Sequence, residues 1–329
     1  MLLKDQEGQS MNKYTLCMVF SILLPLSKGW AMQVMDDSAL AQQTGQDGIT
    51  VSLDFPNSTI SYSELAITDT NGMPTATGAA SLVLAPTTYG TDKGIRFFND
   101  PTANTLATQP VTIKMDAEGN GAKPVLNTEI GLPTDLRRIR INPFSIYLSN
   151  GSGSVFDAGT RVLNATGTVK ATGVREIVKL GTNGIDINFL ANNPVKMNIQ
   201  LGNAPQGHMF VFTGGSITQI KNDPLYPIEL ISNNSSSNSS LKLNFDLSAT
   251  NMATGISLVG FYGDIVNSGL VLGKGGTTDK FNLTLSNVVA GTTGSQSATS
   301  FNNLKNASIG TIGLVGASVT NLKMTVKGL

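Results

Sequence analysis

The stretch Ile49-Thr50-Val51-Ser52-Leu53-Asp54-Phe55 alternates almost strictly between apolar and polar residues. Because successive side chains of a β-strand point to opposite faces, this pattern predicts a strand with one buried face and one solvated face. The same period of two returns at intervals up to the end of the chain. The clearest further cases are residues 60–65, 111–115, 139–141, 185–189, 195–201, 241–247, 281–285 and 322–326.

Turn-forming pairs such as Asn150-Gly151 and Asn183-Gly184 separate these segments, so the chain is predicted to be all-β. In the Gly-rich tail, residues 307–322, apolar residues recur at irregular short intervals that resemble the rungs of a β-solenoid. No fixed period runs through the whole chain. We therefore expect residues 49–329 to form an elongated body of irregular stacked sheets, solenoid-like in part, with one or two β-sandwiches as the alternative. The Ser/Asn-rich residues 232–240 are expected to form an exposed loop.

The first 31 residues have the features of an export signal. Residues 1–10 are polar and are interpreted as an over-extended start, with Met11 as the true one. A lysine and an apolar run over residues 14–26 follow, and Gly29 and Ala31 stand at the −3 and −1 positions of a cleavage site before Met32. The run is too short to span a bilayer, which needs about 20 apolar residues. We expect residues 11–31 to be removed and the mature chain not to be an integral membrane protein.

Composition narrows the function classes. The chain has 22 Lys+Arg and 22 Asp+Glu, so it gives no electrostatic reason to expect nucleic acid as a partner. Only 13% of the residues are charged, about half the usual share. The single cysteine, Cys17, lies in the leader, so the mature chain is expected to fold without disulfides.

Residues that could carry chemistry are few. His208 is the only histidine, and strand alternation places it on the same face as Phe210 and Phe212, at a strand edge beside a turn. The chain has no G-x-S-x-G nucleophile turn and no phosphate-binding loop. Arg138 and Arg140 are interpreted as the solvated face of an edge strand. A glycosidase or lyase uses paired carboxylates, for which Asp54, Glu64, Asp69, Asp186, Asp246 and Asp264 are available. Spacing alone brings no two of them together. We expect no enzymatic activity.

Calcium is the best ligand hypothesis. Asp116, Glu118 and Asn120, followed by Gly121, match the opening of a D-x-[DN]-x-[DN]-G loop, with Glu in the second slot. The position twelve residues into such a loop is Asn127 instead of Glu, and no helices flank it. An ordinary hairpin turn is the favoured alternative.

The segment between the leader and the first strand, residues 32–48, is similar to a motif of secreted pilus-system (FilA-type) proteins of Gram-negative bacteria. These proteins share a (L/M)-D-D-x-x-L-A-x-x-(T/S)-G-Q-D-G-I-T segment after a signal peptide. The motif is carried here by Asp36, Asp37, Leu40, Gly45, Gln46, Asp47 and Gly48. The resemblance implies an exported protein linked to pilus or adhesin assembly. It supplies no catalytic residues.

These observations lead to one expectation with two alternatives. The chain is expected to be an exported, non-enzymatic structural or adhesive component of a pilus or cell-surface system. Its partners would be other surface-assembly proteins, and its location extracellular, on the cell surface, or periplasmic. The alternatives are a secreted calcium- or polysaccharide-binding β module and, less favoured, a polysaccharide-active β-helix enzyme.

Overall fold

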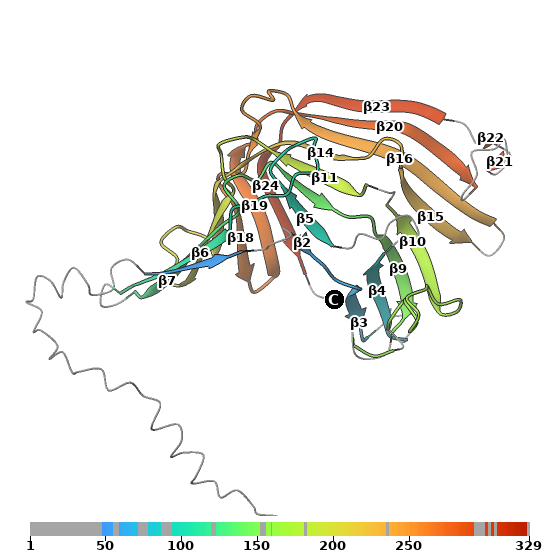
Figure 1. Cartoon of the computed structure of the whole chain (residues 1–329), viewed down its shortest axis with the longest axis horizontal. Coiled ribbons are helices and arrows are strands. Elements are labelled where there is room, and N and C mark those ends of the chain that lie inside the picture. The colour runs from blue at the N-terminus through green and yellow to red at the C-terminus, as the bar shows by residue number, and fades with distance from the viewer. Residues whose placement is uncertain are drawn as a thin grey trace, which may run out of the picture. The chain divides into compact units, whose positions relative to one another are not determined.

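The strands of this protein form two large sheets and one two-stranded sheet (Figure 1). The computed structural model describes residues 48–54, 59–71, 78–86, 94–119, 123–151, 156–158, 160–180, 183–234, 237–292, 300–301, 304–305 and 308–327. Within these ranges the regular elements are β-strands, and no helix is long and apolar enough to cross a membrane. The prediction of an all-β body of irregular stacked sheets is confirmed.

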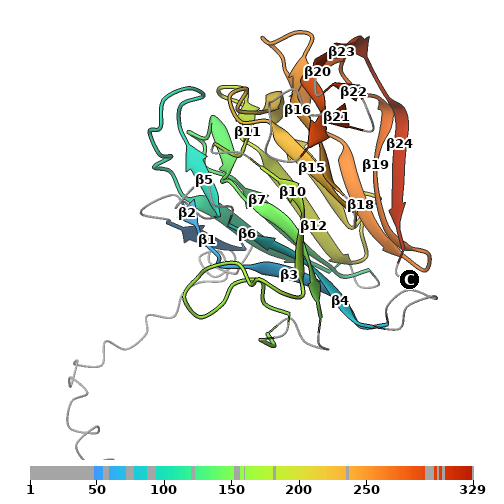
Figure 2. The ribbon, with the colours of Figure 1, turned by 90° about the vertical axis from the view of Figure 1, so that its right-hand side faces the viewer.

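The first sheet has eight strands, and each neighbouring pair is antiparallel. Three hairpins stand side by side in chain order, with one single strand at each edge. Figure 2 shows the last hairpin beside the final strand. The strands in spatial order are β1 (Ile49–Leu53), β6 (Val111–Glu118), β7 (Val125–Gly131), β12 (Lys196–Gly202), β13 (Phe210–Gly214), β18 (Phe261–Val266), β19 (Gly269–Thr277) and β24 (Thr320–Val326).

The second sheet has fourteen strands and is forked. Its spine consists of β16 (Ser237–Ala249), β20 (Phe281–Thr292) and β23 (Ser308–Ala317). One end of β16 pairs with β14 and the other end with β15, so two rows of strands leave the same edge of the spine. The first branch is β14 (Ser216–Asn222), β11 (Ile185–Phe189), β8 (Arg138–Ile141), β5 (Ile95–Phe98) and β2 (Thr59–Ile60), with β17 (Ile256–Ser257) beside β14. The second is β15 (Ile228–Asn234), β10 (Val174–Lys179), β9 (Ser145–Asn150), β4 (Ala80–Ala85) and β3 (Leu65–Asp69).

The chain passes repeatedly between the two sheets. On each of three passes it adds one hairpin to the eight-stranded sheet, and it adds β5, β8, β11 and β14 in order to the first branch. Only this repeated winding is shared with a solenoid. The strand pairing within it is antiparallel, whereas stacked solenoid rungs pair in parallel. The passes differ in length, which explains why the sequence has no fixed period.

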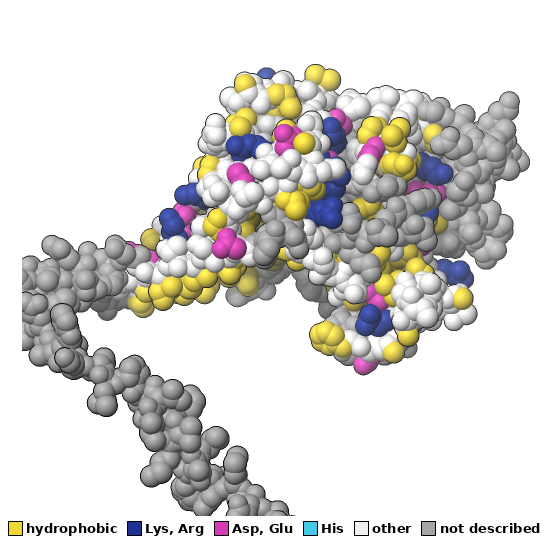
Figure 3. Space-filling view, in the orientation of Figure 1, with side chains coloured by type: hydrophobic (Ala, Val, Ile, Leu, Met, Phe, Trp, Pro, Cys, Tyr) yellow, Lys and Arg dark blue, Asp and Glu magenta, His cyan; other side chains and the backbone are white. Residues whose placement is uncertain are grey.

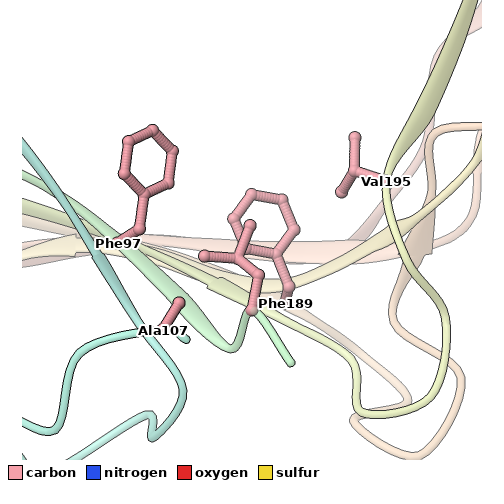
Figure 4. Packing of buried hydrophobic residues seen from close by; sticks show 5 residues of the cluster. Phe97, Ala107, Phe189 and Val195 are labelled. Atoms are coloured by element: carbon pink, nitrogen blue, oxygen red, sulfur yellow. The ribbon is translucent and has the colours of Figure 1, made fainter. Parts of the chain in front are cut away.

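The main core lies where the two sheets approach each other. Phe97 of β5, Phe189 of β11 and Val195 before β12 stand close together, with Ala107 and Leu136 completing the buried cluster (Figure 4). Phe212 of β13 packs against this cluster from the eight-stranded sheet. A second cluster, Val83, Ala85, Tyr147 and Val162, lies against the second branch. Each sheet is therefore stabilised mainly where it is covered, since burial of apolar area is the dominant favourable term.

Three local predictions were wrong. Residues 60–65 do not form one strand, because β2 ends at Ile60 and β3 begins at Leu65 in the other branch. Between them Glu64 accepts hydrogen bonds from the backbone N–H groups of Val162 and Leu163, which fixes the break. The expected loop at residues 232–240 is instead largely strand, since β15 and β16 pair as far as Asn234 and Ser237. The Gly-rich tail forms two long antiparallel strands in different sheets, β23 and β24.

A glycine determines where the first strand begins. Gly48 immediately precedes β1 and has a φ of +62°. A Cβ atom at this position would lie 2.3 Å from the carbonyl oxygen of Met115 on β6. Only glycine fits this close approach without strain, so Gly48 marks a defined start for β1.

Candidate functional site

One face of the eight-stranded sheet is apolar across all eight strands. The strand register brings alternate residues of each strand to this side, which we call the apolar face. Lys274 is the only charged residue on it, and its ammonium group lies 4.9 Å from the centre of the Phe261 ring. The other members are Ile49, Val51, Leu53, Val111, Ile113, Met115, Ala117, Leu126, Thr128, Ile130, Met197, Ile199, Leu201, Phe210, Phe212, Gly263, Ile265, Leu270, Leu272, Leu322, Met324 and Val326.

Much of this apolar face is in contact with solvent. Ile265 is 71% exposed and Ile49 63%. Hydrophobic side chains gather along the margin where β1 and β7 run (Figure 3). The other exposed members are Leu53, Leu126, Leu201, Leu270, Leu322, Met324 and Val326. Summed over the whole face, from edge strand β1 to edge strand β24, these residues leave on the order of 800 Å² of surface in water, against roughly 300–600 Å² for the largest single patch on a typical monomer. A surface of this size indicates an association site.

Both edge strands of this sheet are solvent-exposed. Among the described residues, β1 pairs only with β6 and β24 only with β19. All seven residues of β24 are exposed, and in β1 only Val51 is half-buried. An exposed edge offers unpaired backbone N–H and C=O groups to another strand. The candidate site therefore combines an apolar face with two edges that can accept strands.

The opposite face of the same sheet is polar, and it holds His208. The imidazole Nδ1 lies 2.7 Å from Oδ2 of Asp264, and the ring stacks on Tyr262 with 3.7 Å between ring centroids. Tyr262 pairs with Val211, so its side chain points away from the apolar face. The prediction that His208 shares a face with Phe210 was wrong, because β13 begins only at Phe210 and the preceding turn at Gly207 resets the alternation.

Hydrogen bonds set the protonation of Asp264. Partial burial alone would raise the pKa of this carboxyl group, but two hydrogen bonds outweigh it: one from the Met209 backbone N–H and one from His208. The pKa of Asp264 is therefore lower than usual. The arrangement fixes the imidazole against the sheet and supports the interpretation of His208 as a structural residue beside a turn.

The arginines do not lie on a solvated edge. β8 is an interior strand between β5 and β11, so the prediction for Arg138 and Arg140 was wrong. Arg140 forms a two-pronged pair with Asp186, with N···O distances of 2.6 and 2.8 Å. Arg138 is 2% exposed and lies over the Phe98 ring at 4.2 Å. Sequence reasoning missed these contacts because the order of the strands determines them.

Several of the carboxylates considered for catalysis are held in structural contacts. Asp186 is paired with Arg140, and Glu64 accepts hydrogen bonds from residues 161–163. Asp186 and Asp246 share one face two strands apart, with Lys221 between them, and Asp246 accepts a hydrogen bond from Gln219.

The candidate calcium ligands lie partly on a strand. Asp116 and Glu118 are exposed on one face of β6, and Asn120 lies outside the described residues. The part of the chain that the structure describes contains no group of three or more His, Cys, Asp or Glu side chains arranged for a metal ion. The calcium hypothesis stays a prediction, which a calorimetric titration can test.

Most of the N-terminal predictions fall outside the described ranges. These are the cleavage site at Ala31 and Met32 and the motif residues Asp36, Asp37, Leu40, Gly45, Gln46 and Asp47. Comparisons of the chain with family models, curated proteins and solved structures found no match. The functional argument therefore depends on the geometry of the two sheets.

Proposed function

We propose that this protein is an exported, non-enzymatic structural component of a pilus-like cell-surface assembly. The observation that carries the proposal is the apolar face, of which on the order of 800 Å² is exposed to solvent. A standard interface buries about 800 Å² on each partner, so the face is large enough for a stable contact between proteins.

Other features support the same proposal. The leader-like residues 11–31 and the motif at residues 32–48 favour export. The ion pairs of Asp186 and Glu64 and the stacked His208 are accounted for by structural roles. Low charge over the whole chain favours association driven by apolar contact and strand pairing.

Fractionation of cells that produce the native protein tests the proposal. We expect a mature chain that begins at Met32 and is cut by protease added to intact cells. A periplasmic marker protein that stays uncut is the control for an intact outer membrane. If the protein is protected together with the marker, it is not a surface component and the proposal fails.

A further inference from the structure

The two edges of the eight-stranded sheet are complementary in direction. Adjacent strands alternate in direction across the sheet, and the number of strands is even. β1 and β24 therefore run in opposite directions. A second copy displaced along the sheet would place its β1 antiparallel to β24 of the first, which is the ordinary geometry of this sheet.

The side chains of the two edges also match. Ile49, Val51 and Leu53 of β1 lie on the apolar face. Leu322, Met324 and Val326 of β24 lie on that same face. Antiparallel pairing of residues 49–53 with residues 322–326 would create three apolar cross-strand pairs, which stabilise a sheet.

On the polar side of the proposed β1–β24 pair, no two like charges face each other. There Thr50 would face Thr325, and Ser52 would face Lys323. Pairing of β24 with β24 of a second copy would instead bring two Lys323 side chains close together, which is unfavourable. The β1 sequence has no charge over residues 49–53, so it is the better partner for β24.

We propose that copies of this chain join head to tail, with β24 of one copy paired antiparallel with β1 of the next. The inference rests on the proposed function, because it names the contact by which the surface assembly grows. This heterologous contact repeats from copy to copy, so it produces open filaments, or rings where the rotation between copies closes, instead of two-fold dimers.

Engineered cysteines distinguish this contact from its alternatives. Cys17 is the only cysteine of the sequence, so the chain after the leader has no thiol to interfere. Directly opposed residues in an antiparallel pair have Cα atoms about 4.5–5.5 Å apart, within the range that a disulfide bridges. The variants are Thr50→Cys and Thr325→Cys, made separately in the mature chain. Thr254→Cys, exposed in a turn after β16, is the matched control.

Under mild oxidation we expect a mixture of the Thr50→Cys and Thr325→Cys chains to form covalent dimers at least tenfold more than either chain alone. Dimers from Thr325→Cys alone would assign β24 to self-pairing and overturn the proposal. Dimers of Thr50→Cys alone would assign β1 to self-pairing and would also overturn the proposal. Cross-linking no greater than in mixtures with Thr254→Cys would overturn it as well.

Sedimentation of purified chains provides a second measurement that does not need cysteine. We expect the mature chain to form a concentration-dependent series of oligomers and Met324→Glu to remain monomeric at tenfold higher concentration. Because Met324 is 50% exposed, we expect the variant to fold, and an unchanged circular dichroism spectrum checks this. A native chain that is monomeric throughout contradicts the proposal. Because both measurements use purified protein, they fail or succeed independently of the protease test on cells.

Discussion

At the scale of single residues, the fork in the large sheet depends on two buried asparagines. Asn222 ends β14 and Asn244 lies in β16, and their side chains bond to each other at 2.8 Å. Asn222 also accepts a hydrogen bond from the Phe245 backbone N–H and donates to the carbonyl groups of Asp223 and Tyr226. Asn244 donates to the carbonyl group of Pro224. These amides replace the ladder hydrogen bonds that the fork interrupts.

We predict that Asn222→Ala lowers the free energy of unfolding by about 2–4 kcal/mol. The substitution removes the Asn222 partners of the buried Phe245 N–H group and of the Asn244 side-chain oxygen, at about 1–3 kcal/mol for each unsatisfied group. Denaturant unfolding measures the loss. The control is Asn203→Ala, an exposed site where we expect a change within about 0.5 kcal/mol. Equal losses in the two variants would contradict this account of the fork.

A buried tyrosine predicts a loss of stability in alkali. Burial, followed by the nearby negative charge of Glu176, raises the pKa of Tyr147 to about 12. In the unfolded chain the phenol ionises near pH 10, so the folded state alone retains the proton between pH 10 and 12. The free energy of unfolding should therefore fall by roughly 2 kcal/mol over this range. In Tyr147→Phe that part of the slope should be missing; an identical pH profile would refute the assignment.

At the scale of elements, β8 carries its arginines into the interior of a sheet. Asp186 on the neighbouring strand β11 contacts both Arg138 and Arg140, at 3.5 and 2.6 Å. We predict that Asp186→Asn lowers the free energy of unfolding by about 2–4 kcal/mol, because two largely buried cations lose their counter-charge. The matched control is Lys114→Ala, which removes an ion pair of an exposed lysine on β6 and should cost less than about 1 kcal/mol. Chemical denaturation measures the free energy of unfolding of both variants. Equal losses would contradict the role assigned to Asp186.

The sequence predicts individual strands well because period-two alternation is a local property. Eight of the nine predicted segments, including residues 185–189 and 281–285, lie within or largely within observed strands. The order of strands depends on contacts between distant residues, which alternation does not encode. For that reason Arg138 was placed on an edge and His208 on the wrong face. The exposed apolar face could not be predicted for the same reason. Alternation predicts a buried apolar side for every strand and does not show which of these sides lacks a covering layer.

At the scale of the whole molecule, the apolar face should govern solubility more than stability. We predict that Ile265→Thr combined with Leu201→Thr changes the free energy of unfolding by less than about 1 kcal/mol, because Ile265 is 71% exposed and Leu201 47% exposed. The same variant should bind less of an environment-sensitive hydrophobic dye and associate less. Val83→Thr, a fully buried control in the second cluster, should instead destabilise the protein by more than about 1 kcal/mol. Similar dye binding by Ile265→Thr/Leu201→Thr and the native chain would contradict an exposed apolar face.

The forked sheet also has a consequence for the timing of synthesis. All ten strands that make up the rows of the two branches precede β16 in the chain, and both rows end on β16. Neither row can pair with the complete β16 until residue 249 has been synthesised, which takes roughly 10–50 s at 5–20 residues per second. Until then the nascent chain lacks the strand that unites its largest sheet. Under the export proposed above, this delay would give the chain time to thread through a translocation channel before it folds.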